Sequence, residues 1–258
     1  MSKLINEREG PVARLVLNRP DAGNALDLEL AAQLAQAAAE YADDPSVRCV
    51  VLTGSGRMFC SGGDIGLFAS GDSSAVLREL AGKFHEAITT LATMAKPLLV
   101  LVNGPAAGAG LSLALIGDIV IAARSAHFTA AYTGIGLTPD GGMTWTLQRL
   151  VGLRLAQEMI LTNRRLGAAE ALAAGLVSQV VGKEALVETG ASTAISLASG
   201  PVAALGAARA LLLAGANSTL LQQLHREAEA ISVAGAGDEC REGLAAFLEK
   251  RKPDFPGT

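Results

Sequence analysis

The stretch from Lys96 to Gly110 reads Lys-Pro-Leu-Leu-Val-Leu-Val-Asn-Gly-Pro-Ala-Ala-Gly-Ala-Gly. Its apolar run Leu98–Val102 is short and continuous, which is typical of a strand buried on both faces of a parallel sheet. Asn103-Gly-Pro then predicts a turn, and the Gly/Ala-rich residues near 108–116 predict a helix. A buried strand that turns into a helix in this way indicates an α/β fold.

The flanking sequence repeats this alternation of strands and helices. One helix is predicted over roughly 28–41, with Asp27 as its N-cap, because Asp favours that position. A second helix is predicted near 75–95, where apolar residues recur at helical spacing and Pro97 ends the pattern. The predicted strands are Val12–Leu17, residues 47–52, and Ile119–Ala123.

The alternation continues to about residue 181, which indicates mostly parallel strands. From about 183 to 250 the pattern is only helical, and neither an internal repeat nor a long linker interrupts the chain. We therefore expect a core over residues 1–195 and a helical C-terminal region over 196–258. We expect this helical region to be an added layer or an assembly arm rather than a separate catalytic domain.

The composition excludes several classes of protein. Half of the residues are hydrophobic, and the net charge is −4 without a basic stripe, which argues against a nucleic-acid partner. Cys49, Cys60 and Cys240 are scattered without metal-ligand spacing, so we expect reduced thiols in a cytoplasmic protein and no metal site. The N-terminus has no apolar signal segment, and no apolar run approaches the roughly 20 residues that span a bilayer, so we expect no membrane insertion.

Three further segments follow in a distinctive order. They read Leu17-Asn-Arg-Pro-Asp-Ala-Gly-Asn-Ala-Leu26, Phe59-Cys-Ser-Gly-Gly-Asp-Ile65, and Phe247-Leu-Glu-Lys-Arg-Lys-Pro-Asp-Phe255. Together with residues 96–110, they resemble the crotonase (enoyl-CoA hydratase/isomerase) superfamily along nearly the whole chain. The resemblance implies an α/β fold built as a spiral of ββα units, followed by a C-terminal helical region that assembles homotrimers, often paired into hexamers.

The resemblance also implies chemistry on an acyl-coenzyme A thioester. Reactions of this family pass through an enolate, whose negative oxygen is stabilised by two preorganised backbone N–H groups. By matching positions, these donors are the N–H groups of Gly63 and of Ala109, the latter at the start of the Gly/Ala-rich helix. Glycine-rich turns allow the backbone to approach a ligand closely, and a helix N-terminus favours negative charge.

The family's coenzyme A pocket implies further contacts. Coenzyme A is here part of the substrate, and no other cofactor is expected. Residues 67–76 are expected to border the tunnel for the acyl chain, whose length and identity the sequence leaves open. The residues expected to bind coenzyme A are Asn24, Ala25, Leu26, Cys60, Ser61, Gly62, Asp64, Ile65, Lys250 and Arg251, the last two often reaching the phosphates from a neighbouring subunit.

Departures from the family pattern indicate which branch of the family this chain resembles. Hydratases of the family carry two glutamates, and the matching positions hold Ser112 and Tyr132, neither of which suits ordinary two-glutamate hydration. Asp140 instead matches the catalytic aspartate of certain isomerases, including those that resemble the ring-opening phenylacetyl-CoA isomerase. Asp140 also suits the N-cap of a helix starting at Gly141, so the sequence leaves both roles open.

His85 adds another alternative. It lies where aryl-CoA dehalogenases of the family place a histidine base, and Asp140 matches their nucleophile, but histidine also occurs there in members without that chemistry. The leading hypothesis is an enoyl-CoA isomerase with Asp140 as its acid/base. The alternatives are a hydratase with atypical catalytic residues, an inert coenzyme A-binding homologue, and a dehalogenase.

Overall fold

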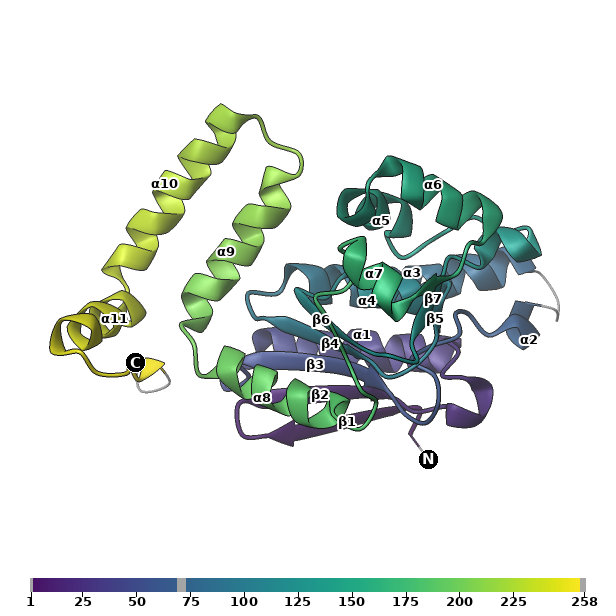
Figure 1. Cartoon of the computed structure of the whole chain (residues 1–258), viewed down its shortest axis with the longest axis horizontal. Coiled ribbons are helices and arrows are strands. Elements are labelled where there is room, and N and C mark those ends of the chain that lie inside the picture. Colours follow the sequence, from purple (N-terminus) through teal and green to yellow (C-terminus); the bar gives the residue numbers. More distant parts are fainter. Residues whose placement is uncertain (1, 69–72, 256–258) are drawn as a thin grey trace.

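A six-stranded sheet forms the centre of the computed structural model, which describes residues 2–68 and 73–255 (Figure 1). The strand order is β1-β2-β3-β4-β6-β9, in which β1 pairs antiparallel to β2 and all other neighbours are parallel. The mixed α/β class and the mostly parallel sheet predicted from the sequence are therefore confirmed. The strands are β1 (Leu4–Glu9), β2 (Val12–Leu17), β3 (Cys49–Gly54), β4 (Leu98–Val102), β6 (Ile119–Ala123) and β9 (Gln179–Val181).

The sheet is buried on both faces, which explains the continuous apolar run of β4. Leu98, Val100 and Val102 join one hydrophobic cluster, whereas Leu99 and Leu101 join a second cluster on the opposite face, as the two-residue period of a strand requires. Helices α1 (Leu28–Asp43) and α3 (Ser73–Thr93) supply side chains to the first cluster, and α8 (Leu186–Ala198) supplies them to the second. Figure 1 shows α8 on one side of the sheet and α1 on the other.

The helix boundaries follow the local signals in the sequence. The side chain of Asp27 accepts a hydrogen bond from the N–H of Leu30 at 2.8 Å, so its predicted role as the N-cap of α1 is confirmed. The third predicted helix is α4 (Ala109–Leu115), and every one of its residues is buried.

A small second sheet is formed by short strands that come after β4, β6 and α6 (Leu153–Thr162) in the chain. Its strands β5 (Ala106–Ala107), β7 (His127–Thr129) and β8 (Leu166–Gly167) were not predicted, because segments of two or three residues carry no readable alternation. The remaining short elements are η1 (Pro20–Ala22), α2 (Ile65–Phe68), η2 (Tyr132–Ile135), α5 (Met143–Val151) and α7 (Ala168–Ala173).

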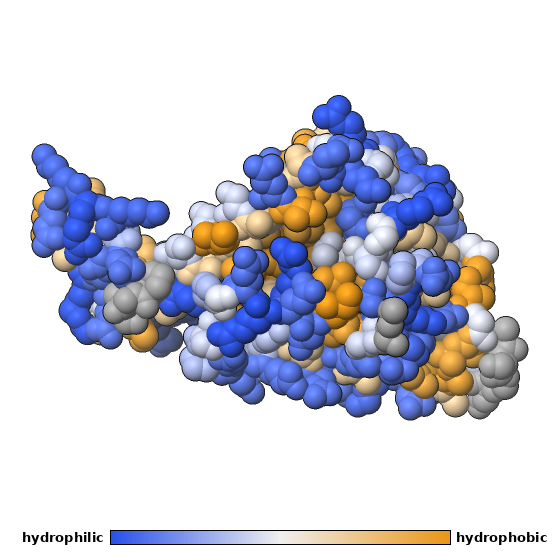
Figure 2. Space-filling model, turned by 90° about the horizontal axis from the view of Figure 1, so that it is seen from below, coloured by the Kyte–Doolittle hydropathy of each residue, from blue (hydrophilic) through white to orange (hydrophobic). Residues whose placement is uncertain are grey.

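The last three helices form a C-terminal arm that stands away from the body in Figures 1 and 2. The arm consists of α9 (Val202–Gly215), α10 (Leu220–Ala236) and α11 (Asp238–Glu249). Arg209 of α9 ties the arm to the body through an ion pair of 2.6 Å with Asp118. The boundary expected at residue 195 falls inside α8, which still packs on the sheet.

The arm exposes many large apolar side chains. They include Leu212, Leu220, Leu221, Ile231, Val233, Leu244, Phe247 and Leu248. Among the described residues, no single helix is long and apolar enough to cross a membrane, although the bent pair α8–α9 meets that test by length and composition alone.

Candidate active site

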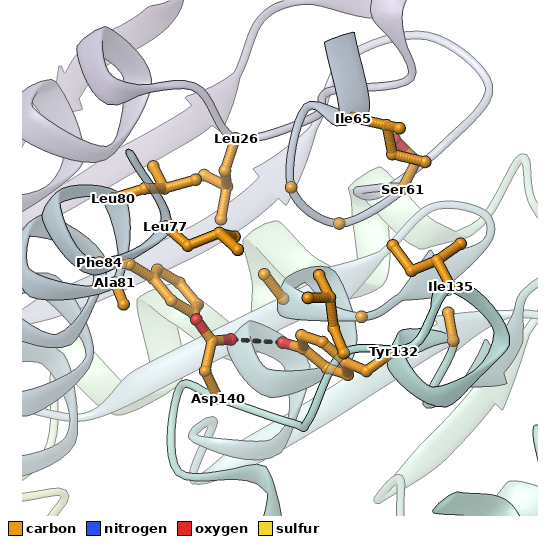
Figure 3. A pocket seen from close by; sticks show the side chains of 16 residues that line it. Leu26, Ser61, Ile65, Leu77, Leu80, Ala81, Phe84, Tyr132, Ile135 and Asp140 are labelled. Atoms are coloured by element: carbon orange, nitrogen blue, oxygen red, sulfur yellow. Dashed lines mark hydrogen bonds between the residues drawn. The ribbon is translucent and has the colours of Figure 1, made fainter. Parts of the chain in front are cut away.

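A cavity of about 180 Å³ opens beside the carboxyl ends of β3 and β4. These strands are parallel neighbours, so the loops that leave them meet at one edge of the sheet, where open α/β folds bind their ligands. Most of the lining is apolar (Figure 3). The lining residues are Leu26, Ser61, Gly62, Gly63, Ile65, Leu77, Leu80, Ala81, Phe84, Gly108, Ala109, Ala131, Tyr132, Ile135, Leu137 and Asp140.

One helix supplies a whole wall of this cavity. Leu77, Leu80, Ala81 and Phe84 lie on a single face of α3, because residues spaced by three and four share a helix face. The sequence shows this periodicity, yet it gave no reason to assign the helix to the site. Residues 69–72, within the segment expected to border the acyl tunnel, lie outside the described residues.

The two predicted oxyanion donors line the same cavity. Gly63 follows β3, and Ala109 is the first residue of α4 after β4. Within the described part of the chain, neither N–H donates a hydrogen bond, so both remain free for a ligand. A developing oxyanion needs two such free N–H groups within one cavity.

Close contact between the two loops sets this arrangement. Gly62 has a φ of +112°, and a Cβ there would lie 3.3 Å from the carbonyl oxygen of Ala107. A residue with a side chain would be strained by that φ and crowded by that oxygen. The glycine at position 62 therefore keeps the loop that carries Gly63 against the loop that carries Ala109.

Asp140 lies in the turn between η2 and α5 and lines the cavity with its carboxyl group. The hydroxyl of Tyr132 donates a hydrogen bond of 2.5 Å to its Oδ1 (Figure 3). The alternative of Asp140 as a helix N-cap is wrong, because α5 begins at Met143 with Gly142 as its N-cap and has no side-chain capping bond. The carboxylate is therefore directed to the cavity rather than to the helix.

Tyr132 and Ser112 both bond to Asp140. Burial, followed by the nearby Asp140 charge, raises the pKa of Tyr132, so this hydroxyl stays protonated and acts as a donor. Ser112 is completely buried, and its hydroxyl donates to the backbone carbonyl of Asp140 at 2.9 Å. Tyr132 thus holds the carboxylate itself, whereas Ser112 holds the backbone of the turn that carries it.

His85 supports the same turn from outside the cavity. Its Nε2 accepts a hydrogen bond of 3.1 Å from the N–H of Gly141, while its ring lies on an exposed part of α3. His85 is not among the residues that line the cavity, and its Nε2 is engaged by the turn, so its possible catalytic role stays a prediction.

Of the ten residues expected to bind coenzyme A, four line the cavity and three are buried beside it, while Asp64, Lys250 and Arg251 are described below. Leu26, Ser61, Gly62 and Ile65 line the cavity. The buried residues Asn24, Ala25 and Cys60 do not line it. Any contact they make with a ligand must therefore come through the backbone.

Asn24 and Cys60 have structural side chains. The amide of Asn24 is completely buried and donates to the carbonyl oxygens of Ser55 and Met58 at 2.9 and 2.8 Å. Burial raises the pKa of the Cys60 thiol to about 12, which keeps it protonated and unreactive. Both side chains hold the loop after β3 from within.

Arg19 is a residue of this region that the sequence analysis missed. Its guanidinium pairs with Asp64 at 2.8 Å and donates to the carbonyl of Ala25 at 2.5 Å. It therefore joins the segment before α1 to the loop after β3. Asp64 also accepts the N–H of Gly66 at 3.1 Å, so its side chain stabilises the loop.

Lys250 and Arg251 directly follow α11, the last helix of the arm, and neither lines this cavity. Figure 1 shows α11 apart from the body of the protein. Arg251 already pairs with Glu242 and Glu249 at 2.5 and 2.6 Å. The expected contact with coenzyme A phosphates therefore needs a neighbouring subunit, and it stays a prediction. Within the described residues, no group of three or more His, Cys, Asp and Glu side chains is placed to hold a metal ion.

Comparison with known proteins agrees with this geometry. Residues 7–258 match the family model for enoyl-CoA hydratase/isomerase. A 1,2-epoxyphenylacetyl-CoA isomerase from Escherichia coli is 38% identical, over 100% of this chain and 99% of that protein. A 2,3-dehydroadipyl-CoA hydratase from the same organism is 37% identical over 100% of both chains. A solved enoyl-CoA hydratase from Bacillus anthracis superposes with a TM-score of 0.95 at 31% identity, covering 99% of this chain and 100% of that one.

Proposed function

Because this chain belongs to the enoyl-CoA hydratase/isomerase family, we propose that it is an isomerase that shifts a double bond of an enoyl-CoA, with Asp140 as its acid/base. The observation that carries the proposal is the placement of one carboxylate, Asp140, in the cavity that also holds the free N–H groups of Gly63 and Ala109. A double-bond shift needs no more than these groups.

The proposed reaction has two proton transfers. The thioester carbonyl accepts hydrogen bonds from Gly63 and Ala109, and the Asp140 carboxylate removes a proton from the carbon next to that carbonyl. The electron pair of the broken C–H bond moves into a dienolate, whose negative oxygen the two N–H groups stabilise. Asp140 then returns the same proton to the carbon at the far end of the dienolate, so the double bond moves and no atom is gained or lost.

The residues at positions 112 and 132 favour isomerisation over hydration. Hydration needs one group to activate water and another to protonate the α-carbon. Ser112 and Tyr132 occupy the positions of the family's two glutamates, and both are engaged by Asp140 as hydrogen-bond donors. A hydratase with atypical residues and an inert coenzyme A-binding homologue remain the alternatives that the assay must separate.

The substrate in this proposal is a coenzyme A thioester with an apolar acyl group, since the cavity is lined mainly by leucine, isoleucine and phenylalanine side chains. Coenzyme A belongs to the substrate, and we propose that no further cofactor takes part. Self-association into a trimer or hexamer and a cytoplasmic location complete the proposal. The first is motivated by the exposed apolar side chains of the arm, and the second by three cysteines without disulfide partners.

The test is to assay the wild-type protein for both reactions. We expect isomerisation of a 3-enoyl-CoA to be faster than hydration of a 2-enoyl-CoA of the same length. Efficient hydration would favour the hydratase, whereas tight thioester binding without either reaction would favour the inert homologue. Calorimetric titration should show that the thioester binds and the free acid binds much more weakly, and equal binding of the two would reject the coenzyme A site.

A further inference from the structure

Among the described residues, three side chains from three different elements form hydrogen bonds with the turn that carries Asp140. Tyr132 of η2 donates to Oδ1 of the carboxylate, Ser112 of α4 donates to the backbone carbonyl of Asp140, and His85 of α3 accepts from the next N–H. The Tyr132 bond is the one that acts on the carboxylate itself. No hydrogen bond from a described residue occupies Oδ2.

We propose that Tyr132 is a positioning residue that fixes the Asp140 carboxylate by its Oδ1 and leaves Oδ2 to carry the proton. The proposal rests on the isomerase function above and assigns a role to a side chain that is not itself an acid or base in the reaction. The proton must leave one carbon and reach another without loss to water, so the oxygen that carries it must be held in one orientation. A carboxylate free to rotate would exchange its two oxygens during this step.

The surroundings of Tyr132 suit a donor rather than a proton carrier. Its ring is partly buried against the core and lines the cavity next to Asp140. Among the residues that line the cavity, Tyr132 and Asp140 are the ionisable ones, and His85 reaches the turn from α3. A hydroxyl that donates to Oδ1 fixes the orientation of the carboxylate without taking up a proton itself.

Tyr132→Phe tests the proposal because it keeps the ring and removes the hydroxyl. We expect kcat for isomerisation to fall about tenfold, as expected for a hydrogen bond to a charged group, with KM within about twofold of wild type. A side chain that only packs against the acyl group would instead change KM and leave kcat in place.

The other tyrosine of the chain provides a matched control. The hydroxyl of Tyr41 donates to the side chain of Asn6, at the junction of α1 and β1 and away from the cavity. Tyr41→Phe therefore also removes one tyrosine hydrogen bond, and it should leave kcat and KM unchanged. An equal loss of kcat in both variants would overturn the positioning role.

A crystallographic measurement separates this proposal from the function on which it rests. Structures of wild type and Tyr132→Phe should show one carboxylate orientation in the former and a rotated or divided orientation in the latter. If the wild type does not isomerise, the proposed function fails, and the carboxylate orientation still decides the role of Tyr132. If the wild type isomerises but Tyr132→Phe keeps the wild-type kcat or changes only KM, the positioning role of Tyr132 fails.

Discussion

Gly110 lies so close to the carbonyl oxygen of Cys60 that a Cβ on Gly110 would be 2.2 Å from that oxygen. The N–H of Ala107 donates to the same carbonyl oxygen at 2.9 Å. The loop that carries Gly63 and the helix that begins at Ala109 are therefore held together by backbone contact. The spacing of the Gly63 and Ala109 N–H groups, the proposed oxyanion donors, depends on this backbone contact rather than on a side chain that lines the cavity.

Gly110→Ala should separate the two segments. A backbone oxygen has no rotamer by which to escape, so we expect a loss of at least about 2 kcal/mol in unfolding free energy, as for overpacked cores. Gly82→Ala is the control, because Gly82 lies in α3 with nothing near a Cβ, and it should gain about 0.5–1 kcal/mol. Urea denaturation measures both, and equal stability of the two variants would contradict the predicted contact.

Asp140→Asn should keep acyl-CoA binding, because the amide is nearly isosteric with the carboxylate. Isomerisation of a 3-enoyl-CoA should fall about 100-fold or more, the usual contribution of a positioned acid–base group. Steady-state kinetics and calorimetry measure the two effects, and thermal melting checks the fold. Normal turnover by this variant would remove Asp140 from the mechanism.

Ser112→Ala should cost much less activity than Asp140→Asn, because Ser112 contacts the backbone of Asp140 rather than its carboxylate. The lost hydrogen bond is buried, so we expect a loss of about 1–3 kcal/mol in unfolding free energy. Denaturation and kinetics on the same preparation measure both quantities. A loss of activity as large as that of Asp140→Asn would instead give Ser112 a direct catalytic role.

The charge of the acyl group should decide substrate preference. A terminal carboxylate on the acyl chain would share a mainly apolar cavity with Asp140, so we expect kcat/KM to be about tenfold or more lower than for an uncharged chain of equal length. The comparison uses 3-hexenoyl-CoA and the six-carbon thioester in which a carboxylate replaces its terminal methyl group. In Asp140→Asn, the difference between the two dissociation constants should narrow, and equal turnover of both substrates by the wild type would contradict the prediction.

The C-terminal arm should mediate self-association. The arm exposes many apolar side chains; those of Phe247 and Leu248, for example, are 82% and 79% exposed in the single chain. Surfaces of this kind are commonly covered in closed symmetric oligomers, and we expect three or six chains. Light scattering at micromolar concentration measures the state, and a stable monomer would contradict the expectation.

The sequence predicts the parts of the fold whose signals are local. The run in β4, the helix that follows it and the Asp27 cap of α1 each depend on neighbouring residues, and each is confirmed. Strand β1 was missed because its sequence, Leu-Ile-Asn-Glu-Arg-Glu, is largely exposed and charged at the edge of the sheet. Only its antiparallel pairing with β2 makes it a strand.

The site shows the same division between local and distant signals. The cavity brings Gly63, Ala109 and Asp140 together as the motifs predict. The role of Arg19 depends on Asp64, 45 residues further along the chain, and no pattern around Arg19 indicates that pairing. The bond between Tyr132 and Asp140 likewise depends on how η2 and the following turn fold back on one another.

The turn after Asp140 also limits how this enzyme could acquire a different chemistry. Gly141 has a φ of +59°, and a Cβ there would lie 2.4 Å from the ring of Phe84 and 2.8 Å from the Cβ of Ser112. A longer acidic side chain at position 112 would enter the space that this turn fills. In a directed-evolution experiment that changes one residue at a time, we therefore expect variants between the proposed isomerase activity and hydratase activity to be poorly active. A library that varies position 112 together with the turn avoids these intermediates.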